Sequence, residues 1–179
     1  MGALLAFSRI IDWLNEKFGR IADWCVLTSC LISAGNATVR YLLSYSTNGL
    51  LEIQWYLFGA LVLLGAPYTL QKNEHVRVDL LYMSVSPRAR LWIDTVGFIV
   101  ILIPASIYLT LLSFPFFWQS FLSDEMSQNA GGLILWPAKL LLPLGFALLT
   151  LQAISELIKR IGGLAGVIEV ETTYEKPLQ

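Results

Sequence analysis

The chain has 179 residues, of which 56% are hydrophobic and only 14% are charged. Because soluble domains carry about a quarter charged residues, this composition excludes an ordinary soluble globular protein. The formal net charge of -1 provides no basic surface, so we expect no nucleic-acid partner.

The first segment, residues 1–20, is predicted to form an amphipathic helix that lies in the membrane interface. Apolar side chains recur there every three or four residues, and charged side chains fill positions between them. The apolar positions are Leu4, Phe7, Ile11, Leu14, Phe18 and Ile21, and the charged ones are Arg9, Asp12, Glu16, Lys17 and Arg20. Such a segment is too polar to span a membrane but is suited to its surface. A plain cytoplasmic extension of the following helix is the alternative.

Longer apolar runs follow at residues 21–43, 51–70, 91–112 and 133–158. Each can cross a hydrocarbon core of about 30 Å, which takes about 20 helical residues. Every backbone polar group must be bonded within the segment there, so the runs are expected to be helices. We therefore predict an all-α integral membrane protein, with a four-helix transmembrane domain at residues 21–160 and a cytoplasmic tail at residues 161–179.

The positions of lysine and arginine predict the orientation of the chain. These residues occur before the first run, between the second and third runs, and after the fourth, whereas the connections 44–49 and 113–132 contain none. Because cytoplasmic loops carry the excess of these residues, both termini are predicted to be cytoplasmic. The connection 113–132 is unusually aromatic, and we expect it to dip into the interface or to pack on another protein.

Among the charged side chains within the apolar runs, we single out Arg40, Glu52 and Lys139. An isolated charge at mid-bilayer costs about 3 kcal/mol, so each needs a partner or a wet cavity. The predicted topology places all three toward the outer ends of their helices. We expect Arg40 to pair with Glu52 across the short connection, with Lys139 in the same layer. The alternative is that Arg40 and Glu52 extend separately to the lipid headgroups.

The first run also carries a polar seam, formed by Ser29, Ser33, Asn36 and Arg40. Their spacing of four, three and four residues places them on one helical face. Small and polar residues line helix–helix contacts in lipid. This face is therefore expected to meet a protein neighbour, either within this chain or outside it.

The sequence does not assemble an enzyme site. His75 is the only histidine, so a haem held by two histidines is excluded within one chain. No nucleophile, base and acid fall in a common layer of the predicted topology either. We therefore expect no catalytic activity, no metal site and no cofactor.

Several motifs, in this chain order, resemble those of a known family. Glu52 and Trp55 open the second run, and His75-Val76-Arg77-Val78-Asp79 follows it. The last run contains Trp136-Pro137-Ala138-Lys139 and then Leu142-Pro143-Leu144-Gly145-Phe146. With the four-span layout, these motifs resemble the DctQ-type small membrane subunit of tripartite ATP-independent periplasmic (TRAP) transporters. The segment 127–133 together with Lys139 looks most like the mannitol/chloroaromatic and 2-oxo-acid branch.

The resemblance implies a small scaffold subunit of a sodium-coupled symporter in the bacterial inner membrane. A periplasmic substrate-binding protein captures an organic acid, a large multi-span DctM-type subunit moves it by an elevator-type motion, and the small subunit braces the large one among the membrane lipids. No substrate site is then expected in this chain. The residues expected to hold the outer layer or to meet the large subunit are Asn36, Arg40, Glu52, Trp55 and Lys139, and those expected to structure the inner loop are His75, Arg77 and Asp79. Asn73 and Glu74 depart from the small or basic residues expected before the histidine.

Two other functions fit a small helical membrane protein. One is an autonomous proton-coupled transporter that works as a homodimer and uses Glu52. The other is the membrane anchor of a redox enzyme, which the single histidine weakens. A proton-coupled site is expected deeper in a span than Glu52, which is predicted near the boundary, so the scaffold is the preferred interpretation.

Overall fold

The computed structural model describes residues 2–75 and 85–167. Its elements in chain order are α1 (Gly2–Leu43), α2 (Asn48–Gln71), α4 (Pro87–Gly97), the π-helical turn η1 (Phe98–Leu102), α5 (Ile103–Leu122) and α6 (Trp136–Leu164). Within the described ranges, the β-type pairing is limited to one isolated bridge between Met126 and Ile134. The prediction of an all-α fold is therefore confirmed.

Three helical segments are long and apolar enough to cross a membrane: α2, the continuous stretch Pro87–Leu122, and α6. They correspond to the second, third and fourth predicted spans. α1 is not among them. The first predicted crossing, by residues 21–43, therefore stays a prediction, as does the cytoplasmic location of both termini.

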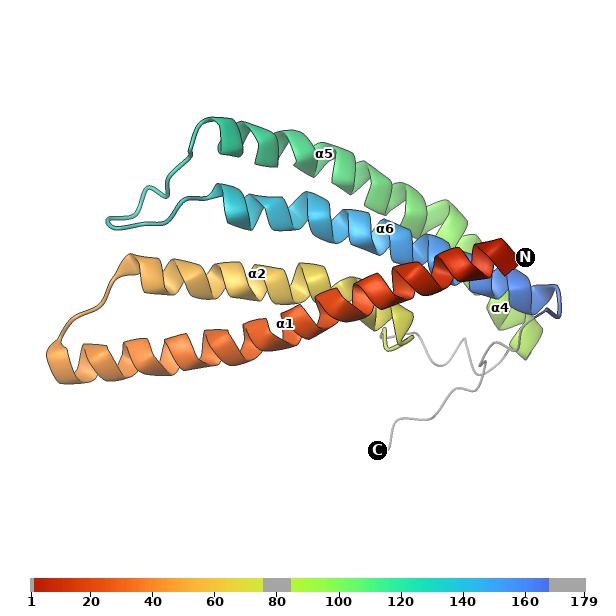
Figure 1. The fold of residues 1–179 in the computed structure, drawn as a ribbon, viewed down its shortest axis with the longest axis horizontal. Helices are drawn as coiled ribbons and strands as arrows, with labels where there is room; N and C mark the ends of the chain where they lie inside the picture. Colours follow the sequence, from red (N-terminus) through yellow and green to blue (C-terminus); the bar gives the residue numbers. More distant parts are fainter. Residues whose placement is uncertain (1, 76–84, 168–179) are drawn as a thin grey trace.

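The helices form an open layer, as Figure 1 shows. α2 and α6 lie side by side in the middle, α1 packs on both of them, and α5 packs along α6. Among the described residues, α5 makes no extensive contact with α1 or α2. In α6, 39% of the most apolar stretch is buried, against 17% in α2 and in Pro87–Leu122. The layer thus has α6 at its centre and leaves broad faces of its outer helices exposed.

α1 is one continuous helix of 42 residues, about 63 Å long, with no break near residue 20. Ile11 is buried, and Leu14 and Phe18 pack against the core of the layer. Leu4 and Ile21, which belong to the same repeat, are exposed. Part of the amphipathic pattern therefore serves packing onto the other helices. The position of residues 1–20 in the membrane interface stays a prediction.

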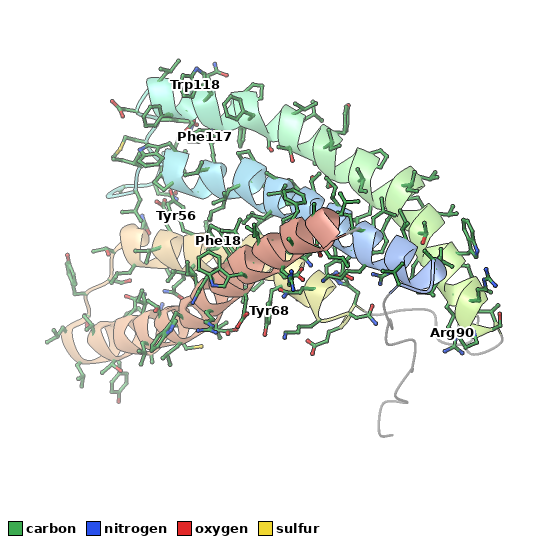
Figure 2. The ribbon with its side chains drawn as sticks, turned by 45° about the vertical axis from the view of Figure 1, so that its right-hand side comes forward. Phe18, Tyr56, Tyr68, Arg90, Phe117 and Trp118 are labelled. Carbon is green, nitrogen blue, oxygen red and sulfur yellow. The ribbon has the colours of Figure 1, made fainter. Side chains whose placement is uncertain are left out.

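The aromatic segment that we assigned to a loop from residue 113 is helical, because α5 continues to Leu122. Phe114 stacks on Trp118 one turn later, with ring centroids 6.1 Å apart, and Phe121 meets the ring of Trp136 in α6 at 5.4 Å. Figure 2 shows Trp118 at the end of α5 that adjoins the following loop. The expectation was wrong because contacts between successive helical turns, and with α6, stabilise a helix here.

A π-helical turn precedes Pro104 in the long helical stretch. The backbone N–H of Ile103 donates to the carbonyl of Phe98, five residues earlier. Proline has no N–H and its ring collides with the carbonyl four residues before it. A wider turn at this position accommodates that disturbance without ending the helix.

Small residues bring α1, α2 and α6 close together at the centre of the layer. The buried cluster between these helices consists of Ala22, Cys25, Ala60, Leu64 and Leu148. A Cβ atom added to Gly145 of α6 would stand 2.7 Å from the Cβ of Leu63 in α2. Since lipid tails are as apolar as the side chains, close packing of this kind is what holds such helices together.

Candidate functional site

Glu52, near the start of α2, lies beneath the loop that joins α5 to α6 and is only 3% exposed. Its Oε1 accepts hydrogen bonds from the Ser127 hydroxyl and from Nδ2 of Asn129 (2.7 Å). Its Oε2 accepts one from the backbone N–H of Leu133 (2.7 Å). A buried carboxylate needs such donors because it has lost its hydration. Glu52 therefore fastens the loop, residues 123–135, to α2.

Two neutral hydrogen bonds fasten the same loop to α2. Nδ2 of Asn48 donates to the carbonyl of Ala130 and the Tyr56 hydroxyl donates to the carbonyl of Ile134, each over 3.1 Å. Figure 2 shows Tyr56 in the first half of α2, toward this loop. We call Asn48, Glu52, Tyr56 and the loop that they bind the Glu52 clamp.

Two glycines allow the loop of the Glu52 clamp to turn tightly. Gly131 has a φ of +69°, in the left-handed region that favours glycine. A Cβ atom at Gly132 would stand 2.5 Å from the Cβ of Ser127. A side chain at Gly132 would therefore displace Ser127, which is one of the donors to Glu52.

Lys139 of α6 binds the same loop through Glu125. Its Nζ forms an ion pair with the Glu125 carboxylate and lies 4.1 Å from the centroid of the Phe116 ring. The hydrogen bond and positive charge of Lys139 lower the pKa of the Glu125 carboxyl. Both Glu52 and Lys139, which the sequence placed in one layer, thus hold the loop between α5 and α6.

The predicted ion pair between Arg40 and Glu52 is not formed. The exposed side chain of Arg40 makes no hydrogen bond or ion pair with any residue that the structure describes. Glu52 takes its donors from a loop more than 70 residues away in the sequence. In the polar seam, Asn36 is buried and accepts a hydrogen bond from the Ser46 hydroxyl (3.2 Å), whereas Ser33 is exposed.

The other predicted site residues are not brought into this clamp. Trp55 is 68% exposed, and His75 is exposed beyond the end of α2. Arg77 and Asp79 lie outside the described residues. The roles expected for these residues stay predictions.

A second polar site, which we did not anticipate, joins the first half of α1 to the second half of α6. Nδ2 of Asn15 donates to Oε1 of Gln152 over 2.7 Å, and both side chains are 0% exposed. Nε2 of Gln152 donates to Asp12 (2.9 Å) and to Glu156 (3.1 Å). These bonds place a buried hydrogen-bonded chain between the two helices.

Ion pairs connect these hydrogen-bonded side chains to α4. Nζ of Lys159 lies 2.7 Å from both Asp12 of α1 and Glu156 of its own helix. Arg160 binds Asp94 of α4 (3.1 Å) and Glu156 (2.7 Å). We call these residues, together with Asn15 and Gln152, the polar network. It fastens α1 and α4 to the same end of α6.

The sequence contained one signal of the polar network. Gln152, Ser155, Glu156 and Lys159 recur at helical spacing and so share one face of α6. Ser155 takes part as well, since its hydroxyl lies 2.6 Å from that of Ser8. We had considered Lys159 only as a boundary charge that indicates orientation.

Comparison with known proteins decides the family. The sequence model of the tripartite ATP-independent periplasmic transporters, DctQ component, matches residues 29–163, about three quarters of the chain. The chain belongs to the DctQ family. No curated protein and no solved structure matches it. The resemblance to a TRAP small membrane subunit is therefore confirmed, whereas the assignment to a branch stays a prediction.

The matched range of this DctQ component contains the whole Glu52 clamp and the α6 side of the polar network. The α1 side, which includes Asp12 and Asn15, lies before residue 29. DctQ is a family of transporter components and not an enzyme family, and this membership together with three apolar helical segments indicates a membrane protein. The two polar sites of this DctQ component bind helices and a loop of the chain to one another.

Proposed function

We propose that this DctQ component is the fixed scaffold of a sodium-coupled TRAP transporter for an organic acid. In this proposal it braces a large multi-span DctM-type subunit in the bacterial inner membrane, and a periplasmic substrate-binding protein delivers the solute. The membership of the DctQ family supports the assignment to a tripartite transporter. The scaffold role rests on the arrangement of the helices.

The observation that carries the scaffold role is the open layer. α5 packs along α6 and, among the described residues, makes no extensive contact with α1 or α2, so the four helices do not close into a bundle. The charged groups of the Glu52 clamp and of the polar network bind other parts of this chain, which leaves them engaged in holding its shape. The broad exposed faces of the outer helices are then available to a partner protein.

We further propose that the membrane domain crosses the bilayer four times with both termini in the cytoplasm. Residues 21–43 of α1 would supply the first crossing, since 23 helical residues rise about 35 Å. The lysine and arginine distribution supports the orientation. In this orientation the Glu52 clamp faces the periplasm and the polar network lies toward the cytoplasm.

The alternative, an autonomous proton-coupled transporter, requires Glu52 to exchange protons and solute. Its carboxylate lies beneath a loop and accepts three hydrogen bonds. In each transport cycle the Glu52 carboxylate would have to break these three hydrogen bonds, and their loss would slow turnover. The same bonds suit a group that holds a loop in place.

The test is to purify the tagged chain in mild detergent from cells that also make the large subunit. We expect the large subunit to co-purify. In liposomes we expect sodium-dependent uptake only when the large subunit and the periplasmic protein are added. Solute movement by the chain alone, driven by a proton gradient and abolished by Glu52→Gln, would contradict the scaffold role.

A further inference from the structure

Between residues 23 and 40, the exposed side chains on one side of α1 are mostly small or polar, whereas the opposite side also carries large apolar ones. The positions on the first side recur every three or four residues and so share one helical face. They are Asp23, Val26, Cys30, Ser33, Ala37 and Arg40, all of which are exposed, and we call them the small-residue face. The opposite side carries exposed large apolar residues, namely Trp24, Leu31 and Leu42.

A hollow between α1 and α2 continues the small-residue face at its Asp23 end. The hollow has a volume of about 400 Å³. Its lining combines small residues with larger ones: Gly19, Ala22, Asp23, Gly65, Ala66 and Thr69 with Leu61, Val62, Tyr68 and His75. The surface beside the small-residue face is therefore indented. Such a surface lets the backbone of another helix approach closely.

The small-residue face has opposite charges at its two ends. Asp23 and Arg40 are 17 residues apart, which corresponds to about 26 Å along a helix and is close to the thickness of a hydrocarbon core. Neither side chain makes a hydrogen bond or an ion pair within the described part of the chain. Charged groups at membrane depth are found facing partners or water rather than lipid tails.

We infer that the small-residue face of α1 receives a transmembrane helix of the large subunit, an inference that rests on the proposed function. That helix would present an acidic side chain level with Arg40 and a basic one level with Asp23. The large apolar side chains on the opposite side of α1 would then face lipid.

The charge distribution favours a different chain over a second copy of this one. Two copies inserted in the same orientation and related by a two-fold axis place identical residues at equal depth. Arg40 would then face Arg40, and Asp23 would face Asp23. Like charges brought together in this way oppose association, whereas a different helix can match both ends.

Photocrosslinking in the complete transporter tests this assignment. A photoreactive phenylalanine derivative replaces Ala37 on the small-residue face, and the matched control replaces Leu31 on the opposite side of the same helix. We expect position 37 to crosslink to the large subunit and position 31 not to. A crosslink from 37 to a second copy, no crosslink from 37 in an intact complex, or a crosslink to the large subunit from 31 alone would each overturn the inference. Failure of the wild-type chain to co-purify the large subunit would instead refute the proposed function.

Charge variants test the end of the face at Arg40. Arg40→Glu should lower the recovery of the large subunit by at least about tenfold, because an acidic partner would be repelled. Arg40→Lys should retain most of it. Arg9→Glu, the same exchange at an exposed arginine near the start of α1, is the control. Wild-type recovery with Arg40→Glu would show that Arg40 does not meet an acidic group of the partner and would overturn this contact.

Discussion

Replacing Gln152 by leucine tests whether the polar network holds α1 against α6. The exchange nearly preserves side-chain volume but removes one hydrogen bond accepted from Asn15 and two donated to Asp12 and Glu156. It also removes the hydrogen bond that Nδ2 of Asn15 donates. Because Oδ1 of Asn15 has no described partner in the wild-type chain, the whole buried amide is then without one. Helix–helix hydrogen bonds in membranes average about 0.6 kcal/mol each, and bonds to charged groups reach about 1.5–3 kcal/mol. If all three bonds have the lower value, the loss is about 2 kcal/mol, and if the two bonds to carboxylates have the upper value, it is about 7 kcal/mol. We therefore expect the free energy of unfolding to fall by about 2–7 kcal/mol.

The assay is reversible unfolding of the full chain in mixed detergent micelles, followed by tryptophan fluorescence and circular dichroism. The matched control is Gln54→Leu, because the amide of Gln54 donates to Leu50 of its own helix; its effect should be below about 1 kcal/mol. The double variant of Asn15→Leu with Gln152→Leu removes both members of a pair, so its loss should be smaller than the sum of the single losses. Equal unfolding free energies for Gln152→Leu and Gln54→Leu would refute the reasoning.

Two other predictions concern the loop and the helix contact. The pKa of Glu125 is lowered from 4.5 by Lys139, so the carboxylate stabilises the loop above pH 4.5 and loses this contribution as the pH falls through its lower folded-state pKa. Hydrogen-exchange protection of the loop amides should therefore decrease below about pH 4.5, and Lys139→Gln should flatten this dependence; protection that is independent of pH would contradict it. Gly145→Ala should destabilise the chain by about 1–3 kcal/mol through overlap with Leu63, whereas Gly97→Ala, where a Cβ meets open space, should stabilise it by about 0.5–1 kcal/mol. Unfolding curves that rank these two variants in the opposite order would disprove the close approach of α2 and α6.

Local sequence patterns predicted the helices better than they predicted the contacts. The runs 51–70 and 133–158 became α2 and α6, with bounds that differ by a few residues at most ends. A long apolar run in lipid has no alternative to a helix, so composition is sufficient there. The apolar pattern did not predict the end of α5, because the ring contact between Phe121 and Trp136 depends on how α5 packs on α6.

The polar contacts could not be predicted in the same way, because they join distant parts of the chain. Arg40 and Glu52 are close in sequence and opposite in charge, which made a pair between them attractive. The partners of Glu52 lie 75 or more residues away in a loop whose fold depends on Gly131 and Gly132. Asn15 and Gln152 are 137 residues apart. Spacing within a helix shows which residues share a face, but it does not show what that face meets.

The Glu52 clamp and the polar network fasten the α1–α2 pair to the α5–α6 pair near opposite ends of the molecule, with Gly145 and Leu63 in close contact between them. Sliding one pair along the other by a single residue, about 1.5 Å, would strain both fastenings at once. Shear along the helix axes is therefore opposed at both ends of the molecule. A force that acts along the axis of one pair would pass to the other pair through both fastenings.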